Sequence, residues 1–333
     1  MSSALPAHHR PNGGFRNPWG NGQLHGFAAF IKWRLFDRAT VPLRPDPDPS
    51  VFSRAAPAFA RPRAAAERVT VTWVGHATFL LQAGGLNILT DPMWSERAGP
   101  VQFAGPRRVV PPGIAFEDLP PIDIVLQSHN HYDHLDAGTV RRLAAEHPDA
   151  QWLAPLGLER WLARHGTRAR ELDWWSAARI GGLALTATPA QHFSARSPFD
   201  RDRTLWCGWS IAAPSRRIFF AGDTGYHPEF PEIGRRLGPF DLALVPIGAY
   251  DPRWFMRPVH MDPEEAVRAV TDLAGDGAAP AMVPMHWGTF KLTDEPLDEP
   301  PRRASAAWTA ASLPAARFWL LAHGDTRSIE GAR

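Results

Sequence analysis

The segment Ser128-His-Asn-His-Tyr-Asp-His-Leu-Asp136 constrains the fold of this chain more than any other part of its sequence. It follows directly on residues 122–126, a nearly unbroken apolar run that is typical of a strand buried on both faces. Each polar side chain buried at such a strand end needs a partner, and a divalent metal ion serves several imidazoles and carboxylates at once. The alternative is a solvated, histidine-rich turn. The candidate ligands here are His129, His131, Asp133 and His134.

Three further candidate ligands each follow a run that we expect to form a strand. They are His192, Asp223 and His286. A single histidine after a strand is more often structural than functional, but loops at strand ends are where α/β scaffolds assemble their sites. The seven candidates together suit two ions that share one bridging carboxylate. The sequence therefore predicts a binuclear metal centre.

The expected division of ligands between the two ions follows from the spacing within the loop. The first ion is assigned His129, His131, His192 and Asp223, and the second Asp133, His134, Asp223 and His286. Two ions held about 3.5–4 Å apart can lower the pKa of a shared water and orient it for attack. Asp133 and Asp223 are also the catalytic candidates, because they hold the ions and can accept a proton. The sequence singles out no general acid for the leaving group.

Short strands alternate with helices from Val69 onward, which predicts a layered α/β architecture. A helix is expected over 137–146, and another over 266–273 after Asp262-Pro-Glu-Glu265, which can form a capping box. Strands are expected at 69–73, 77–81, 86–89, 122–126, 151–154, 183–188, 218–220, 242–246 and 281–284. We therefore place the catalytic domain at residues 69–333.

Residues 1–68 read as an N-terminal extension rich in proline, alanine and arginine. Within it, Leu24–Arg38 carries apolar residues at helical spacing, with basic residues between them. This pattern predicts an amphipathic helix at about 24–38. Either the helix packs on the main domain, or it lies at a membrane interface with its apolar face in lipid.

Composition excludes several other classes of protein. The net charge of +2 and the absence of a dense basic stripe argue against a nucleic-acid partner. Cys207 is the single cysteine, so no internal disulfide can form. Because the sequence has neither a membrane-length apolar run nor a signal peptide, the expected location is cytoplasmic. Peripheral contact with the inner face of the membrane is compatible with this location. Solvated positions are expected for His8, His9, His147, His165 and His227.

The pattern His-x-His-x-Asp-His, with a later His, Asp and His, resembles the metallo-β-lactamase superfamily. Further blocks resemble the N-acyl-phosphatidylethanolamine-hydrolysing phospholipase D family, and they lie at 72–78, 89–92, 128–136, 171–175, 220–226, 246–256, 260–266 and 286–290. The resemblance implies an αββα sandwich and two zinc ions, although iron or manganese suits the same ligands. It also implies a phosphodiesterase that releases N-acylethanolamine and phosphatidic acid from a phospholipid, and a homodimer.

The resemblance extends to residues around the centre. Tyr132 and His260 match positions associated in that family with the acyl-amide end of the substrate. His76 and Asp91 are expected to orient the ligand imidazoles, and Arg257 to pair with a phosphate. Where the family has an aromatic residue shortly after Ser194, this chain has Arg196.

The expected reaction is metal-assisted hydrolysis of a phosphodiester. Two other activities belong to the same fold: a lactonase or other small-molecule hydrolase, which needs no lipid-facing surface, and a nuclease, which needs a basic arm. A non-catalytic binding protein on this scaffold is a further alternative, but such proteins commonly lose ligands.

Overall fold

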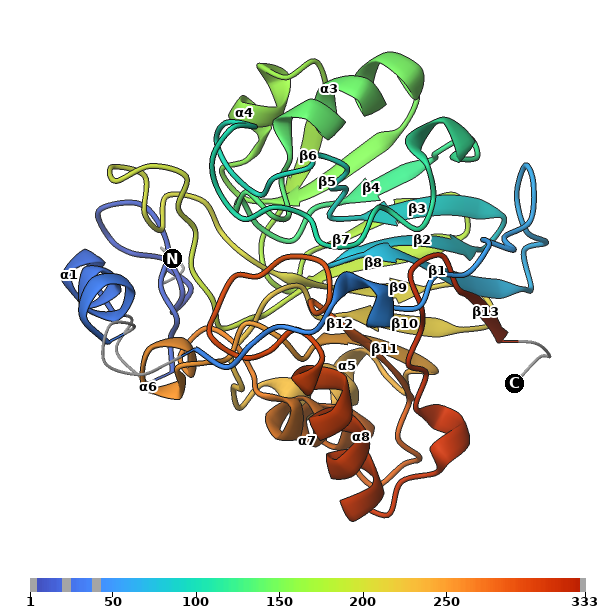
Figure 1. Ribbon diagram of the computed structural model, residues 1–333. Coiled ribbons are helices and arrows are strands. Elements are labelled where there is room, and N and C mark those ends of the chain that lie inside the picture. Colours follow the sequence, from blue (N-terminus) through green and yellow to red (C-terminus); the bar gives the residue numbers. More distant parts are fainter. Residues whose placement is uncertain (1–4, 20–24, 38–42, 330–333) are drawn as a thin grey trace.

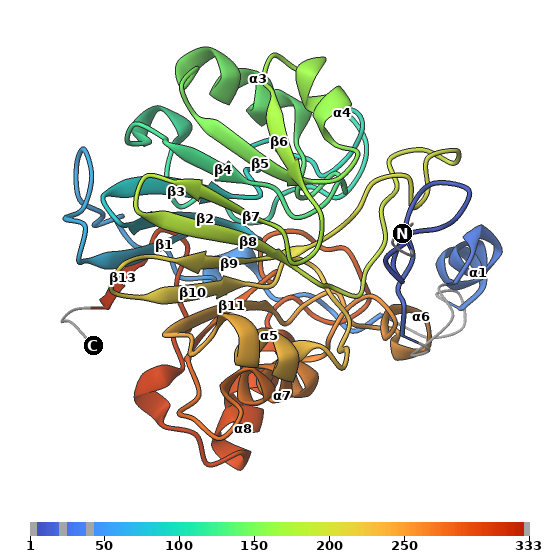
Figure 2. The ribbon, with the colours of Figure 1, turned by 180° about the vertical axis from the view of Figure 1, so that it is seen from behind.

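The computed structural model describes residues 5–19, 25–37 and 43–329, and within them two mixed β-sheets lie face to face (Figures 1 and 2). The first sheet has the strand order β13-β1-β2-β3-β4-β5-β6, and the second β12-β11-β10-β9-β8-β7. The strands of the first sheet are β1 Val69–Gly75, β2 Thr78–Ala83, β3 Leu86–Thr90, β4 Ile124–Leu126, β5 Gln151–Pro155, β6 Ala169–Leu172 and β13 Thr326–Ile329. Those of the second are β7 Ala177–Ile180, β8 Leu183–Thr188, β9 Gly208–Ala212, β10 Arg217–Phe220, β11 Leu242–Pro246 and β12 Ala281–Met285.

Helices cover the outer face of each sheet, which gives the αββα layering that the family resemblance implied (Figure 1). The first sheet is covered by α3 Ala137–Glu146 and α4 Glu159–Ala163, and the second by α5 Phe230–Leu237, α7 Pro263–Ala274 and α8 Glu299–Ala310. Short 3-10 turns are η2 Pro49–Val51, η3 Phe116–Asp118 and η4 Ala315–Arg317. The largest apolar cluster lies between the sheets and includes the fully buried Trp73 and Trp209. The expected capping box of Asp262 and Glu265 begins α7.

The strands that the sequence did not predict are β6, β7, β9 and β13. Three of these, β6, β7 and β13, lie at the edges of their sheets, and many of their side chains are half-buried or exposed. Because an edge strand needs few apolar residues, Ala169–Leu172 and Thr326–Ile329 carry little hydrophobic signal. The predicted strands match the observed ones to within two residues at each end.

The direction of the strands brings the candidate ligands to one edge of the sandwich. In the first sheet β3 and β4 are parallel, and β1 runs the same way because two antiparallel steps separate it from β3. In the second sheet β10, β11 and β12 are parallel, and β8 again shares their direction. The segments that carry the candidates leave the carboxyl ends of β1, β3, β4, β8, β10 and β12.

The N-terminal helix is shorter than predicted and buries a different side chain. α1 covers Phe27–Ile31 and continues as a π-helical turn, η1 Lys32–Asp37, while Leu24 and Arg38 lie outside the described residues. Trp33 is 2% exposed and packs beside α6 Arg253–Met256, whereas Leu35 of the predicted apolar face is 62% exposed. The helix thus packs on the main domain through Trp33 and not through Leu35, because the π-helical turn departs from the 3.6-residue repeat.

Other described residues of the N-terminal segment also pack on the main domain. Phe15 belongs to the apolar cluster between the sheets, and Phe59 belongs to the cluster beneath α3. Gln82 and Asn87 hold the backbone at Ala60 and Pro62 with hydrogen bonds of 2.8–2.9 Å. Among the described residues, no helix is long and apolar enough to cross a membrane.

Candidate metal centre

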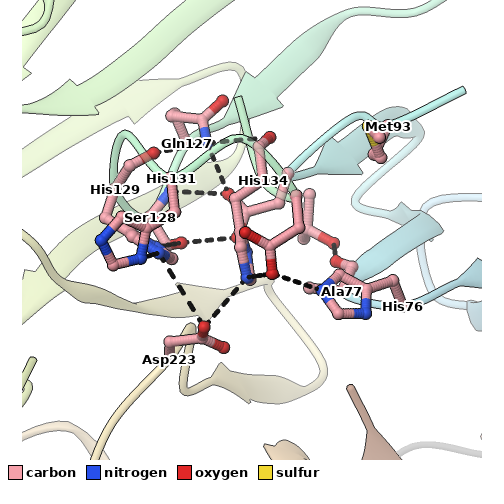
Figure 3. A network of polar contacts seen from close by, with 12 residues as sticks. His76, Ala77, Met93, Gln127, Ser128, His129, His131, His134 and Asp223 are labelled. Atoms are coloured by element: carbon pink, nitrogen blue, oxygen red, sulfur yellow. Dashed lines mark hydrogen bonds and ion pairs between the residues drawn. The ribbon is translucent and has the colours of Figure 1, made fainter. Parts of the chain in front are cut away.

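The loop 128–136 is held in place from both of its ends. At the β4 end, the Gln127 amide donates to the carbonyl oxygens of His129 (2.9 Å) and His134 (3.2 Å). At the other end, Asp136 caps α3 by accepting hydrogen bonds from the N–H groups of Gly138 and Thr139. Figure 3 shows this loop folded back on itself, with Asp223 approaching from the neighbouring sheet. Such bracing fixes side chains before any ligand arrives.

Three histidines meet on one side of the centre. Nδ1 of His131 lies 2.9 Å from Nε2 of His129 and 3.1 Å from Nε2 of His192. These three ligand atoms all lie within 4.8 Å of one another. Burial lowers the pKa of His131 to about 3 and that of His192 to about 4, and the pKa of His129 also lies well below its ordinary value. The neutral imidazole is the form that binds a metal.

A second group forms beside the first, around Asp133. The Asp133 Oδ2 atom lies 3.4 Å from Nε2 of His134, 3.4 Å from Nε2 of His286 and 2.9 Å from Nε2 of His76. Ligand atoms of these four residues also lie within 4.8 Å of one another. His76 thus contacts the candidate ligand Asp133 at the edge of this group, and its expected orienting role stays a prediction.

Asp223 stands between the two groups. Its Oδ2 atom is 3.0 Å from Nε2 of His134 and 3.1 Å from Nε2 of His286, on the side of Asp133. The same oxygen is 3.9 Å from Nε2 of His129 and 3.8 Å from Nε2 of His192, on the other side. All seven side chains singled out in the sequence thus converge on one point, with one carboxylate oxygen facing both groups.

Several buried polar atoms in the centre lack a hydrogen-bond partner among the described residues. They are Nε2 of His134, both ring nitrogens of His286 and Oδ1 of Asp223. The two Nε2 atoms approach Asp223 closely, yet without hydrogen-bond geometry. Unsatisfied polar atoms are costly when buried, and closely spaced nitrogen and oxygen atoms around a common point are what shared metal ions require. The residues present fit a pair of divalent ions.

The charges of the centre lead to the same conclusion. Burial acts to lower the pKa of His286, but the charges of Asp223 and Asp133 outweigh it and raise this pKa to about 9. The pKa of His134 is likewise raised well above its ordinary value by the two carboxylates, against the effect of burial. Asp133 and Asp223 therefore attract positive charge strongly, and in the absence of cations two protonated imidazoles provide it. Divalent ions would replace those protons.

Two groups contact the outer ring nitrogens of candidate ligand histidines: the carboxylate of Asp91 and the carbonyl of Val259. Asp91 Oδ2 lies 2.7 Å from Nδ1 of His134, and the same carboxylate accepts hydrogen bonds from the N–H group and hydroxyl of Ser128. The carbonyl of Val259 lies 2.9 Å from Nδ1 of His192. Each contact leaves Nε2 of the histidine facing the centre. The sequence analysis identified Asp91 but not Val259, because a backbone carbonyl carries no side-chain signal.

Arg196 braces the loop from outside. Its guanidinium donates to the carbonyls of Asn130 (2.7 Å) and Leu135 (2.8 Å), and it stacks over the Tyr132 ring at 4.0 Å. The Tyr132 hydroxyl donates in turn to the Arg196 carbonyl at 2.6 Å. The arginine at this position therefore supports the metal loop, which sequence reasoning did not foresee.

The two remaining expectations have different outcomes. His260 lies beside the centre, with its ring 5.1 Å from that of His192, and its Nδ1 atom is buried without a partner among the described residues. Arg257 does not join the cluster: its side chain is 75% exposed and its Nε atom lies 3.5 Å from Glu265. The pairing of Arg257 with a phosphate stays a prediction, and in this structure its exposed guanidinium faces the carboxylate of Glu265.

Comparisons with known proteins agree with this architecture. Residues 86–287 match the family model of the β-lactamase superfamily domain. An uncharacterized protein of Mycobacterium tuberculosis is 43% identical over 83% of this chain and 72% of its own length. An N-acyl-phosphatidylethanolamine-hydrolyzing phospholipase D of Caenorhabditis elegans is 44% identical over 66% of this chain, and the match spans 64% of the nematode protein. A metallo hydrolase of the archaeon Ignicoccus hospitalis superposes with a TM-score of 0.59 at 23% identity, covering 79% of this chain and 99% of the archaeal one.

Proposed function

Because this chain belongs to the β-lactamase superfamily and has the metallo-β-lactamase fold, we propose that it is a binuclear phosphodiesterase that hydrolyses an N-acylated phospholipid in the manner of a phospholipase D. The coarser class, a metal-dependent hydrolase, follows from the family and the histidine–aspartate centre together. The observation that carries the proposal is the position of Asp223 Oδ2 between two groups of ligand atoms. The nematode relative is named for this reaction.

The proposed ligands are those that converge in the structure. His129, His131 and His192 would hold one ion, Asp133, His134 and His286 the other, and Asp223 both. The ions, zinc in the first instance with iron or manganese as alternatives, would neutralise phosphate charge and activate water. The carboxylates of Asp133 and Asp223 would then hold the proton that the attacking water releases.

An apolar cluster next to the centre favours a lipid substrate. The Phe193 ring lies 4.4 Å from the His131 ring and packs with Trp33, Phe255, Met256 and Val259. At this cluster α1 and α6 lie side by side in both views (Figures 1 and 2). We propose that an acyl chain lies along the cluster, with Tyr132 and His260 near its amide end. A hydrolase of small polar molecules has no need of such a surface.

The outer side of the same region suits peripheral contact with a membrane. Exposed apolar side chains gather on α1, η1 and α6: Phe30, Leu35, Phe36 and Trp254. The Lys32 ammonium lies 5.1 Å from the Trp254 ring, which places positive charge beside these apolar groups. Apolar side chains next to basic ones are typical of surfaces that bind anionic lipid. The active centre would then face the bilayer from which its substrate comes.

Parallel assays of one purified sample test the proposal. We expect hydrolysis of N-acylated phosphatidylethanolamine in vesicles, weaker hydrolysis of bis-p-nitrophenyl phosphate, and loss of both after chelation. Replacing Leu35 by Glu should slow only the vesicle reaction, whereas Phe103→Glu, in an even more exposed position between β3 and β4, should not. Activity restricted to an acyl lactone or to RNA would instead identify the chain as a lactonase or a nuclease.

A further inference from the structure

A second cluster of metal-binding side chains lies in the N-terminal segment, apart from the centre described above. Nε2 of His8 lies 2.7 Å from Oδ1 of Asp173, and Nε2 of His9 lies 2.8 Å from Oδ2 of the same carboxylate. Ligand atoms of the three residues lie within 4.8 Å of one another. Sequence reasoning expected both histidines to be solvated, which is wrong for His8, because only 7% of this residue is exposed.

The surroundings hold each of these side chains in its orientation. The His8 ring stacks on Trp174 with centroids 4.2 Å apart, and the His9 ring meets the edge of Phe15 at 5.1 Å. The N–H group of Trp174 donates to Oδ1 of Asp173 at 2.8 Å. Rings fixed by stacking and a carboxylate fixed by a backbone N–H are the kind of support that metal ligands have in proteins.

The carboxylate is also electrostatically prepared for a cation. Partial burial acts to raise the pKa of Asp173, but its hydrogen bonds with His8, His9 and the Trp174 N–H, and its attraction to His8, outweigh this and lower the pKa below its ordinary value. Asp173 is therefore ionised near neutral pH. Its side chain is 25% exposed and that of His9 21%, so an ion can enter from solvent and keep water in its remaining positions.

We propose that His8, His9 and Asp173 form a separate, structural site for a divalent transition-metal ion such as zinc. Two imidazoles and one carboxylate, completed by water, are a common ligand set for zinc. The site would join the N-terminal segment to the connection between β6 and β7, where the chain passes from the first sheet to the second. This proposal does not depend on the substrate of the main centre.

The chain that carries His8 and His9 also contacts the main centre. From His8 and His9 the segment continues to Asn17, whose side chain donates to the His192 carbonyl at 2.9 Å and accepts from the His192 N–H at 3.2 Å. Between them, the Phe15 N–H donates to the Asp202 carbonyl at 2.8 Å. In both views this segment lies beside the loop that follows β8 (Figures 1 and 2). An ion at His8 would thus secure the chain that supports His192.

Zinc binding to the full chain tests the proposal. The metal-free protein is dialysed against micromolar free zinc, and bound zinc is measured by elemental analysis. We expect the unaltered protein to bind one more ion per chain than Asp173→Asn, whose affinity at this site should fall at least about tenfold. Asparagine can still form hydrogen bonds with both imidazoles, so this variant separates metal binding from simple anchoring. Zinc should also slow tryptic cleavage after Arg16 in the unaltered protein but not in Asp173→Asn.

Two more variants complete the experiment. His165→Gln is the matched control, because His165 stacks on Trp161 at 3.7 Å as His8 does on Trp174, yet it belongs to no metal-binding group among the described residues. If Asp173→Asn folds poorly, His8→Gln tests the same site, and we expect it also to bind one zinc ion fewer than the unaltered protein. Equal zinc content in all four proteins, or cleavage after Arg16 that zinc does not slow, would overturn the proposal and leave the cluster as a hydrogen-bonded anchor.

Discussion

The strand-end loops and the N-terminal segment both reach the candidate metal centre, but they are held there in different ways. The loop 128–136 follows a fully buried strand and is fixed by Gln127, Asp91 and the cap of α3. The N-terminal segment is attached at separate points, among them Phe15 and Trp33, with exposed residues between them. The difference indicates that the two sheets and their loops fix the positions of the candidate ligands. The N-terminal segment then packs against these residues from outside.

The largest effect should come from the carboxylate that faces both groups of ligands. Asp223→Asn keeps the size of the side chain but removes the charge that the two sets of imidazoles share. Because metal ions contribute several kcal/mol to such reactions, we expect kcat/KM to fall at least about 10³-fold and most bound metal to be lost. Activity assays and elemental analysis of the same sample measure both. Retention of metal with near-normal turnover would remove Asp223 from the centre.

A smaller effect is expected behind the ligands, where Asp91 orients His134. Asp91→Asn removes the negative charge that faces Nδ1 of His134 at 2.7 Å but keeps a similar shape. Residues in such positions typically change metal affinity about 10–100-fold. Competition with a chromophoric chelator measures this affinity. Ser128→Ala is a second variant, which keeps the Asp91 charge but removes the contacts of the Ser128 hydroxyl with Asp91 and with Nδ1 of His129. If Asp91→Asn binds metal as tightly as the unaltered protein, His134 does not depend on Asp91.

The same contrast explains what the sequence could and could not predict. The ligands were predictable because each follows an apolar strand, and strands that run in one direction bring their ends to one edge. The role of Arg196 was not predictable: its partners are the backbone carbonyls of Asn130 and Leu135, more than sixty residues away. The contacts of His8, Asn17 and Trp33 join segments more than 160 residues apart, and no local pattern encodes them.

Where the N-terminal segment packs on the main domain, we expect an effect of intermediate size on the free energy of unfolding, and this effect should depend on pH. His227 is fully buried, and its ring stacks against Trp19 of the N-terminal segment (4.7 Å) and against Phe230 (4.2 Å). The expectation that His227 is solvated is therefore wrong, and burial lowers its pKa to about 3. Below pH 6.5 the unfolded chain binds a proton there that the folded chain does not, so the free energy of unfolding falls as pH decreases toward 3.

Replacing His227 by Phe should remove this part of the pH dependence. Between pH 7 and pH 5 the unaltered protein should lose about 2 kcal/mol more of its free energy of unfolding than His227→Phe does. Urea unfolding of both proteins at the two pH values, in chelator so that the metal centre contributes equally, measures the difference. Parallel pH profiles would mean that His227 takes up a proton in the folded state, and hence that the Trp19 contact opens readily.

The smallest effect should come from Asn17, where the N-terminal segment meets a ligand through the backbone alone. Asn17→Ala removes two hydrogen bonds to His192 but leaves Nδ1 of that histidine at the Val259 carbonyl. We expect the free energy of unfolding to fall by about 1 kcal/mol and metal affinity to change by much less than in Asp91→Asn. Urea unfolding and chelator competition measure the two quantities. A loss of metal affinity as large as that in Asp91→Asn would contradict this contrast between the loops and the N-terminal segment. The N-terminal segment would then contribute to the metal centre as directly as Asp91 behind His134 does.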